Sequence, residues 1–279
     1  MHKETRAGKS EKWWWTGPSA VYLCSLASLV LNQAVDKIVG NFSSYVVLQI
    51  LIFALPLLLV LFFVKNVEKV PFWSSTGFTK ISWLRVVAFT AILNFVSFLL
   101  SASLFSAGEY LAPRLPEGAR YDPGAVQTAF QGLPRAAYWY MIFTSVVYAG
   151  FGEELTFRGY ILTRLSRKGK LFAVATSALM WSSLHLWYLP TLGSTGIWQH
   201  LDVLLVGILF GAAYLKIQSI LPLIAAHAFS NTLLPLSFLY PGAMVDTLAF
   251  AFLTVGFLVC VGLSVSWIYS RFVRGPSGT

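Results

Sequence analysis

Charged residues are scarce in this chain. Only 11% of its 279 residues are Asp, Glu, Lys or Arg, whereas 57% are hydrophobic, and the mean hydropathy is +0.69. Soluble domains carry roughly 25% charged residues, so the composition excludes an ordinary soluble protein. The apolar residues fall in runs of about 20, which is the length of one membrane crossing. The sequence therefore predicts an all-α, polytopic membrane protein.

Negative charge is the scarcer sign, with 11 acidic residues against 20 basic ones and a net charge of +9. A basic excess can indicate nucleic-acid binding, but here the Lys and Arg residues are scattered in short connections between apolar runs. This scatter is what membrane topology requires. We therefore predict a lipid bilayer, and no nucleic acid, as the partner of the basic residues.

Cysteine is nearly absent. The two cysteines, Cys24 and Cys260, lie in apolar runs near opposite ends of the chain and have no metal-type spacing. We interpret both as packing or lipid-facing residues. The first apolar run also lacks a small-residue cleavage site, so it is predicted to be an uncleaved span rather than a signal peptide.

Eight apolar runs predict about eight transmembrane helices. The second run contains Pro56, which a membrane helix tolerates as a kink. The chain then divides into a basic tail (1–17), one transmembrane helical domain (18–270) and a short tail (271–279). The predicted spans are residues 18–39, 43–64, 83–107, 136–157, 171–189, 197–217, 220–239 and 246–270.

The positions of Lys and Arg predict the orientation, because cytoplasmic connections are enriched in both. With the N-terminus inside, the inner segments hold fifteen basic residues and the outer segments hold four, while Arg158 lies within the membrane. Both termini are therefore predicted to be cytoplasmic, in the plasma (inner) membrane. The longest outer connection, residues 108–135, is rich in proline and glycine and is predicted to be a loop.

The fourth apolar run ends in a cluster of charges, Glu153, Glu154 and Arg158. A charge at the membrane centre costs at least about 2.5–3.5 kcal/mol, so charges there usually have a function. At about 100° per residue the two acids project onto different faces, whereas Glu154 and Arg158 share one face. We expect Glu154 to be paired and Glu153 to be free. The alternative is an ordinary charge network at the membrane surface.

Two later spans contain polar residues at helical spacing. Trp181 and His185 are four residues apart in the fifth span, and His227 and Asn231 are four apart in the seventh. Any one of these residues can serve as a packing hydrogen bond between helices. Together with a carboxylate they supply a base, a proton shuttle and hydrogen-bond donors, which suffice to hydrolyse an amide. The other histidines, His2 and His200, receive no role.

These three motifs, in this order and on separate helices, resemble the signature of the CPBP family, the CAAX protease and bacteriocin-processing membrane proteases, which includes the type II CAAX prenyl endopeptidases. The motif residues are Glu153-Glu154 with Arg158, Trp181 with His185, and His227 with Asn231. The match covers about residues 138–235. Phe is commoner in the family at the position of Trp181, a departure that we expect to matter little.

The resemblance implies a glutamate-dependent intramembrane endopeptidase that needs no cofactor and cleaves a membrane-associated peptide or protein. In this analogy Glu153 and His185 activate a water, and His227 and Asn231 stabilise the oxyanion. The supporting residues would be Glu154, Arg158 and Trp181. Nothing in the sequence selects between prenylated and other substrates. His185 falls ~20 Å from the inner end of its span, so we expect the fifth helix to begin early, with Lys168 and Lys170.

Two alternatives compete with this interpretation. Glu153, His185 and His227 could instead bind zinc and leave a fourth position for water, although the sequence has no His-Glu-x-x-His helix. The chain could also be a transporter or a non-catalytic scaffold with a polar core. A transporter usually shows related halves, and no internal repeat is visible in the sequence.

Overall fold

The computed structural model describes residues 7–38 and 42–272, and every regular element in these ranges is helical. The predicted all-α polytopic fold is thereby confirmed. In chain order the elements are α1 (Ala7–Ile38), α2 (Phe42–Phe62), η1 (Phe63–Val67), α3 (Phe72–Ser75), α4 (Trp83–Leu111), η2 (Ala112–Arg114), η3 (Glu117–Ala119), α5 (Ala125–Phe130), α6 (Arg135–Thr144), η4 (Ser145–Leu162), α7 (Thr163–Leu165), η5 (Ser166–Lys168), α8 (Lys170–Ser183), α9 (Tyr188–Leu192), α10 (Ser194–Ile217), α11 (Leu221–Leu239) and α12 (Ala243–Phe272).

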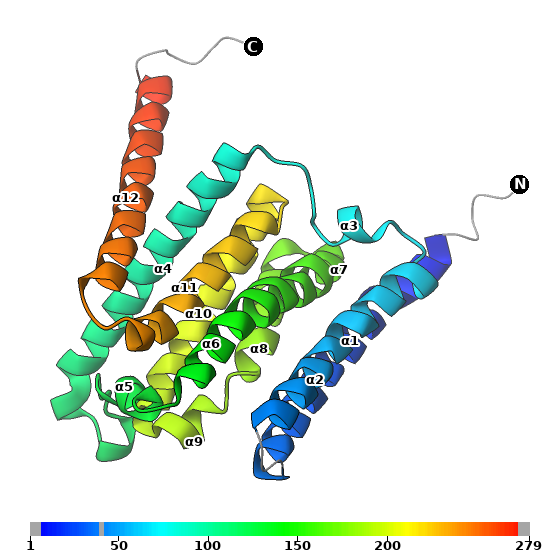
Figure 1. Ribbon diagram of the computed structural model, residues 1–279. Coiled ribbons are helices and arrows are strands. Elements are labelled where there is room, and N and C mark those ends of the chain that lie inside the picture. Colours follow the sequence, from blue (N-terminus) through cyan, green and yellow to red (C-terminus); the bar gives the residue numbers. More distant parts are fainter. Residues whose placement is uncertain (1–6, 39–41, 273–279) are drawn as a thin grey trace, which may run out of the picture.

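The long helices alternate in direction along the chain. In Figure 1, α1 descends and α2 returns, α4 descends and α6 with η4 rises, α8 descends and α10 rises, and α11 descends before α12 rises. Short connections between long apolar helices favour antiparallel neighbours in this way. As a result, the start of α1 and the end of α12 lie at the same end of the molecule, the upper end in Figure 1.

Six described helices are long and apolar enough to cross a membrane, and they coincide with six of the predicted spans. The fourth predicted span corresponds to the helical segment from α6 through η4, which carries the charge cluster. The fifth, predicted for residues 171–189, corresponds to α8, which ends at Ser183. The protein is a multi-pass membrane protein, but eight crossings are not confirmed.

The prediction for the fifth helix is wrong at its C-terminal end, for two local reasons. Nδ1 of His185 lies 3.1 Å from the Trp181 carbonyl oxygen, and the His185 N–H donates to Ser182 instead. The side chain thus replaces the backbone bond that would continue the α-helix. Pro190, in addition, has no N–H to donate. At its other end α8 includes Lys170 but not Lys168, which lies in η5.

The N-terminal boundary also differs from the prediction. Residues 1–17 were expected to form a tail, but α1 already begins at Ala7 and continues through Pro18. Residues 1–6 and 273–279 lie outside the described ranges, so half of the residues in the two predicted tails are not described.

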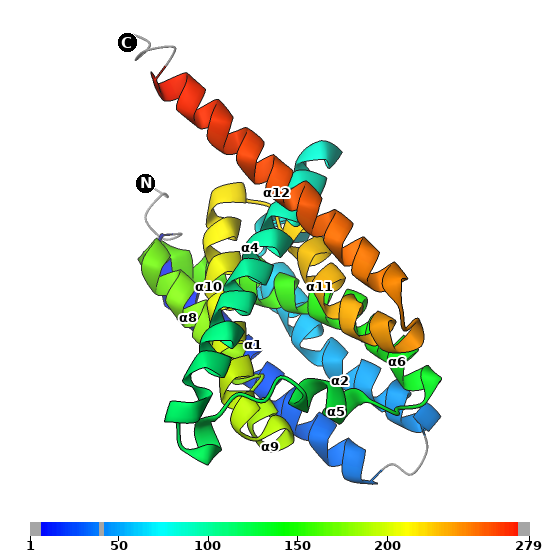
Figure 2. The same cartoon turned by 90° about the vertical axis from the view of Figure 1, so that its left-hand side faces the viewer.

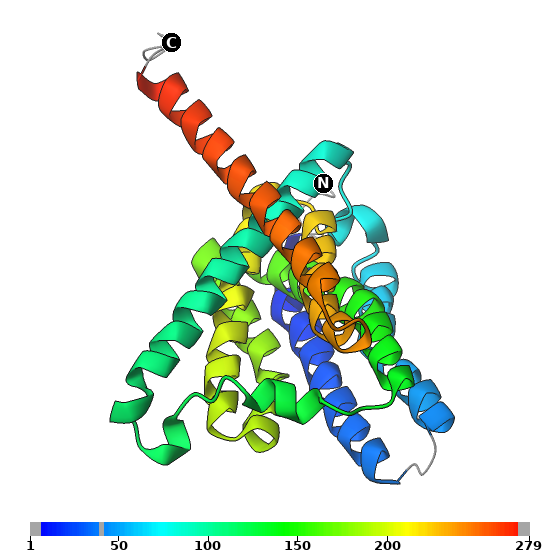
Figure 3. The same ribbon diagram turned by 60° about the vertical axis from the view of Figure 1, so that its left-hand side comes forward.

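Side chains from the segments predicted to be inner gather at the upper end. Arg164 forms an ion pair of 2.6 Å with Glu68, and the Lys168 ammonium lies 5.0 Å from the centre of the Trp14 ring. The connection with α5 runs across the opposite end, near α9 (Figures 2 and 3). This grouping agrees with the alternation of the helices, while the end that faces the cytoplasm stays a prediction.

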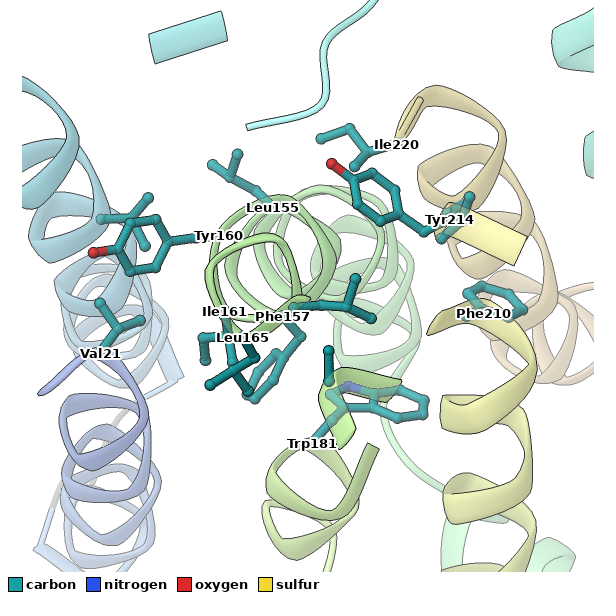
Figure 4. Packing of buried hydrophobic residues seen from close by; sticks show 14 of the residues in the cluster. Val21, Leu155, Phe157, Tyr160, Ile161, Leu165, Trp181, Phe210, Tyr214 and Ile220 are labelled. Atoms are coloured by element: carbon teal, nitrogen blue, oxygen red, sulfur yellow. The ribbon is translucent and has the colours of Figure 1, made fainter. Parts of the chain in front are cut away.

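The core is built around η4, which packs against α1, α2, α6, α8, α10 and α11. Figure 4 shows η4 between Val21 of α1 on one side and Phe210 and Tyr214 of α10 on the other. Tyr160, which is fully buried, projects from η4 towards Val21. The segment that carries the charge cluster is therefore also the central helix of the bundle.

Gly150 permits a close approach between η4 and α11. A Cβ atom at this position would lie 2.8 Å from the Cβ of Ala228 and 3.1 Å from the carbonyl oxygen of Ile224. Small residues allow membrane helices to approach in this way. The contact places Glu154, about one turn further along η4, next to His227 of α11.

Candidate functional site

Glu154 lies at the centre of a buried ion-pair cluster. Its Oε1 accepts hydrogen bonds from Nη1 of Arg158 at 3.0 Å and from Nδ1 of His227 at 2.8 Å. Glu154 is fully buried and Arg158 is 1% exposed. The predicted pair of Glu154 and Arg158 is thus present, and His227 joins it. A buried carboxylate of this kind is stable only while its partners remain.

Glu153 points away from this cluster. No ion pair of the described residues involves Glu153, as expected, but its Oε2 accepts a hydrogen bond of 2.5 Å from Nε1 of Trp181, which was not expected. The physical reason is that η4 and α8 pack closely enough to bring the indole N–H to the carboxylate, a contact that spacing along one helix cannot reveal. Glu153 is 7% exposed and borders a cavity.

Trp181 joins the two groups of charges. Its ring face supports the Arg158 guanidinium, whose carbon lies 4.3 Å from the ring centre, which is a cation–π contact. Its N–H holds Glu153, and its carbonyl oxygen contacts His185. We expected a Trp in place of the commoner Phe to matter little at this position. Of the two residues, however, only Trp supplies an N–H donor.

His185 lies in the turn after α8, and its hydrogen bond determines which ring nitrogen is available. A carbonyl oxygen only accepts, so Nδ1 carries the hydrogen that binds the Trp181 carbonyl. Nε2 of the neutral ring then keeps its lone pair. Among the four candidate catalytic residues, Glu153 and His227 are buried, His185 is half-buried and Asn231 is exposed.

A cavity of about 640 Å³ brings three of the candidates together. Glu153, His185 and Asn231 line it, and we call it the Glu153 cavity. The cavity reaches exposed residues of α9 at Pro190 and Thr191. Its size is typical of a ligand-binding site. The further residues that line it are Leu29, Asn32, Gln33, Phe53, Tyr148, Leu184, Trp187 and Tyr188.

His227 does not line the Glu153 cavity. It borders a second cavity of about 400 Å³, the α4–α10 cavity, together with Trp181, His185 and Asn231. His185 and Asn231 therefore belong to both cavities. The four predicted catalytic residues are close together in the bundle, but they are distributed over two adjoining spaces.

Asn32 and Gln33 of α1 are polar residues of the Glu153 cavity that the sequence did not point to. The available signal was weak, since both lie near the end of an apolar run, where polar residues are common. Only the packing of α1 beside η4 and α2 shows that they belong to the site.

The zinc alternative requires Glu153, His185 and His227 to converge on one point. Within the described part of the chain, no group of three His, Cys, Asp or Glu side chains is arranged to hold a metal ion. His227 directs Nδ1 to Glu154, and Glu153 accepts the indole N–H. In this arrangement the three side chains do not fit a zinc site.

Comparison with known proteins identifies the central segment. Residues 135–233 match the family model described as type II CAAX prenyl endopeptidase Rce1-like. The matched range begins at α6 and ends within α11, so it contains all seven residues of the three motifs. No curated protein and no solved structure matches the chain.

Proposed function

Because residues 135–233 belong to the Rce1-like family of CAAX intramembrane endopeptidases, we propose that this protein is a glutamate-dependent endopeptidase. In this proposal it hydrolyses a peptide bond of a membrane-associated substrate, and the reaction takes place where the two cavities adjoin. The observation that carries the proposal is the convergence of Glu153, His185 and Asn231 on one cavity inside an apolar bundle.

Glu153 and His185 activate the attacking water in this mechanism. One carboxylate oxygen of Glu153 is held by Trp181, which leaves the other, Oε1, for the water. Nε2 of His185 carries a lone pair and can accept a second hydrogen bond from the same water. Glu153 takes the proton as the water attacks the carbonyl carbon, and later returns it to the leaving nitrogen.

His227 and Asn231 stabilise the tetrahedral oxyanion. The carboxylate of Glu154 only accepts, so Nδ1 of His227 carries a hydrogen. Nε2 can donate to the oxyanion only if it carries a hydrogen as well. The donating form of His227 is therefore the imidazolium, whose positive charge Glu154 compensates. This requirement assigns Glu154 a second role besides pairing with Arg158.

The position of the cavity bears on the side from which substrate enters. The Glu153 cavity reaches the surface at Gln33, Pro190 and Thr191, at the end of the molecule opposite to the start of α1. With both termini cytoplasmic, that end faces the outside, and we propose that substrate enters there. Reporter fusions at Gly118 and Gly169 should report opposite sides, with Gly169 inside. The reverse result would place the opening in the cytoplasm.

The proposed activity is tested with the purified full-length chain in lipid nanodiscs. A set of quenched fluorescent peptides, each with a farnesyl or palmitoyl anchor, is incubated with the protein, and products are identified by mass spectrometry. We expect cleavage that persists after prolonged treatment with EDTA or 1,10-phenanthroline. Loss of cleavage with the chelator and its recovery with zinc would support the metal-dependent alternative.

Glu153→Gln protein serves as the matched control, since it differs in one carboxylate. Cleavage at equal rates by both proteins would reveal a contaminating peptidase. The absence of cleavage of every anchored peptide by the unaltered protein would argue for the non-catalytic scaffold.

A further inference from the structure

Glu153 does not line the α4–α10 cavity. His185, His227 and Asn231 border it, and its remaining walls come from Trp181 of α8, Tyr188 of α9 and residues of α4, α10, α11 and α12. The last four helices lie side by side in Figure 2. A volume of about 400 Å³ accommodates an amino-acid side chain or a short peptide segment. Of the residues that line this cavity, only His185, His227 and Asn231 take part in the proposed reaction.

Two polar stripes face each other across the α4–α10 cavity. Asn94, Ser97 and Ser101 lie at helical spacing on one face of α4, and Gln199 and Asp202 lie three residues apart on α10. Both helices are otherwise apolar enough to span a membrane. Polar groups at such positions are expensive in lipid and mark substrate or ion pathways.

Asp202 is the acid of this cavity, and it has no cationic partner within the described residues. The Ser101 hydroxyl donates to Oδ1 at 2.6 Å. The ion pairs of the described residues involve other acids. Asp202 lies about 12 Å along α10 from its first residue, at 1.5 Å per residue. A carboxyl group in an apolar span is costly as an isolated anion, and a cation paired with it would stabilise its charged form.

We propose that the α4–α10 cavity is a subsite for a basic side chain of the peptide substrate, whose ammonium or guanidinium group pairs with Asp202. The proposal rests on the proposed peptidase function. His185 and Asn231 border both cavities, so the scissile bond of an extended peptide lies between them. Substrate residues on one side of that bond then occupy the Glu153 cavity, and those on the other side occupy the α4–α10 cavity.

The remaining walls favour a basic side chain over a neutral or acidic one. The amide nitrogen of Asn94 donates to the Thr90 carbonyl at 3.0 Å, which leaves its side-chain oxygen as an acceptor. No Lys or Arg lines the cavity. Val203 and Val206 provide an apolar wall against which the methylene stem of a Lys or Arg can pack. An acidic side chain would lie near the Asp202 carboxylate, and the positive charge of His227, which also borders the cavity, is already paired with Glu154.

The test measures binding separately from cleavage. Palmitoylated peptides that differ only by Lys, Gln or Glu at each of three positions on either side of the scissile bond are titrated onto Glu153→Gln protein in nanodiscs. The same peptides are titrated onto Glu153→Gln/Asp202→Asn protein. We expect a Lys peptide to bind about ten- to hundredfold more tightly than its Gln counterpart at one position, as for a hydrogen bond between charged groups. Asp202→Asn should abolish that difference.

Cleavage by proteins with an intact Glu153 distinguishes a failure of the subsite from a failure of the peptidase function. Cleavage without Lys preference, equally fast in Asp202→Asn protein, would overturn the subsite and leave the peptidase function standing. Lys-selective binding that depends on Asp202, without any cleavage, would support the subsite and refute the peptidase function. If Asp202→Asn protein loses binding equally for every peptide, Asp202 has a structural role and the proposal is overturned.

Two further variants sharpen the result. Glu109→Gln removes one negative charge from an exposed position on α4 that does not line the cavity, and it should leave the Lys preference unchanged. Asp202→Lys should reverse the preference, so that the Glu peptide binds more tightly than the Lys peptide. If Asp202→Lys protein does not fold, as judged by thermal unfolding, the isosteric Asp202→Asn variant still decides the question.

Discussion

Glu153 and Glu154 are adjacent in the sequence, yet they belong to two different regions of the molecule. The region around Glu154 is a closed ion-pair cluster with Arg158 and His227, in which Glu154 has no exposure. The region around Glu153 borders an open cavity, and Glu153 has a single hydrogen bond from Trp181. The charge of Glu154 holds helices together, whereas the carboxylate of Glu153 keeps one oxygen available for the proposed reaction.

The two regions have opposite requirements. A buried ion pair needs every partner in place, because removal of one leaves an uncompensated charge. A general base needs an unoccupied oxygen and access to water. The wide turns of η4 direct successive side chains into these different surroundings, which agrees with the frequent occurrence of π-helical turns at functional sites. Variants of the two regions should therefore damage different properties.

The largest expected effect on activity is that of Glu153→Gln. Gln still accepts the Trp181 N–H but cannot take a proton, so turnover should fall to the background while the melting temperature stays within a few degrees. Glu154→Gln should instead lower the melting temperature strongly, because Arg158 and His227 lose their carboxylate. Peptide cleavage and thermal unfolding, measured on both proteins, check this comparison. If activity survives Glu153→Gln but not Glu154→Gln, the roles of the two acids are exchanged.

Arg158→Ala should have the largest effect on stability. It leaves the carboxylate of Glu154 with His227 alone and removes the cation from the Trp181 ring. For a buried pair the loss is roughly 3–5 kcal/mol. Thermal unfolding in detergent measures it, with Arg114→Ala in the exposed connection as the control. A stable but inactive Arg158→Ala protein would indicate that Arg158 contacts the substrate.

Asn231→Ala should reduce the rate without unfolding the protein. The side chain borders both cavities and is proposed to donate to the oxyanion. Loss of one such donor typically costs 10²–10³ in kcat, so residual activity should exceed that of Glu153→Gln protein. Steady-state kinetics should show the change in kcat rather than in KM. A variant that changes KM alone would assign Asn231 to substrate binding.

Trp181→Phe should have the smallest effect and bears directly on the difference between the two regions. The Phe ring can still support Arg158, but the N–H donor to Glu153 is lost. We expect roughly a tenfold loss of kcat, from the lower range for a hydrogen bond to a charged group, with stability nearly unchanged. Trp198→Phe, near the start of α10, is the matched control. An unchanged kcat would show that Glu153 does not need this bond.

Several properties followed from the sequence alone. The apolar runs determined the all-α membrane fold, since lipid leaves helices as the way to satisfy the backbone of such segments. The i, i+4 spacing of Glu154 and Arg158 determined their pair, because both residues belong to one helix. The three motifs likewise predicted the resemblance to CAAX proteases, and all three lie in the segment 135–233 that matches the Rce1-like family model. Each of these properties depends on neighbours along the chain.

The tertiary structure decided what depends on contacts between helices. The partner of Glu153 is Trp181, 28 residues away, and the second partner of Glu154 is His227, 73 residues away. Neither contact has a periodic signal in the sequence, because each arises from the close packing of η4 with another helix. The same holds for Asp202, because only the packing of α4 against α10 places it in one cavity with His185 and His227.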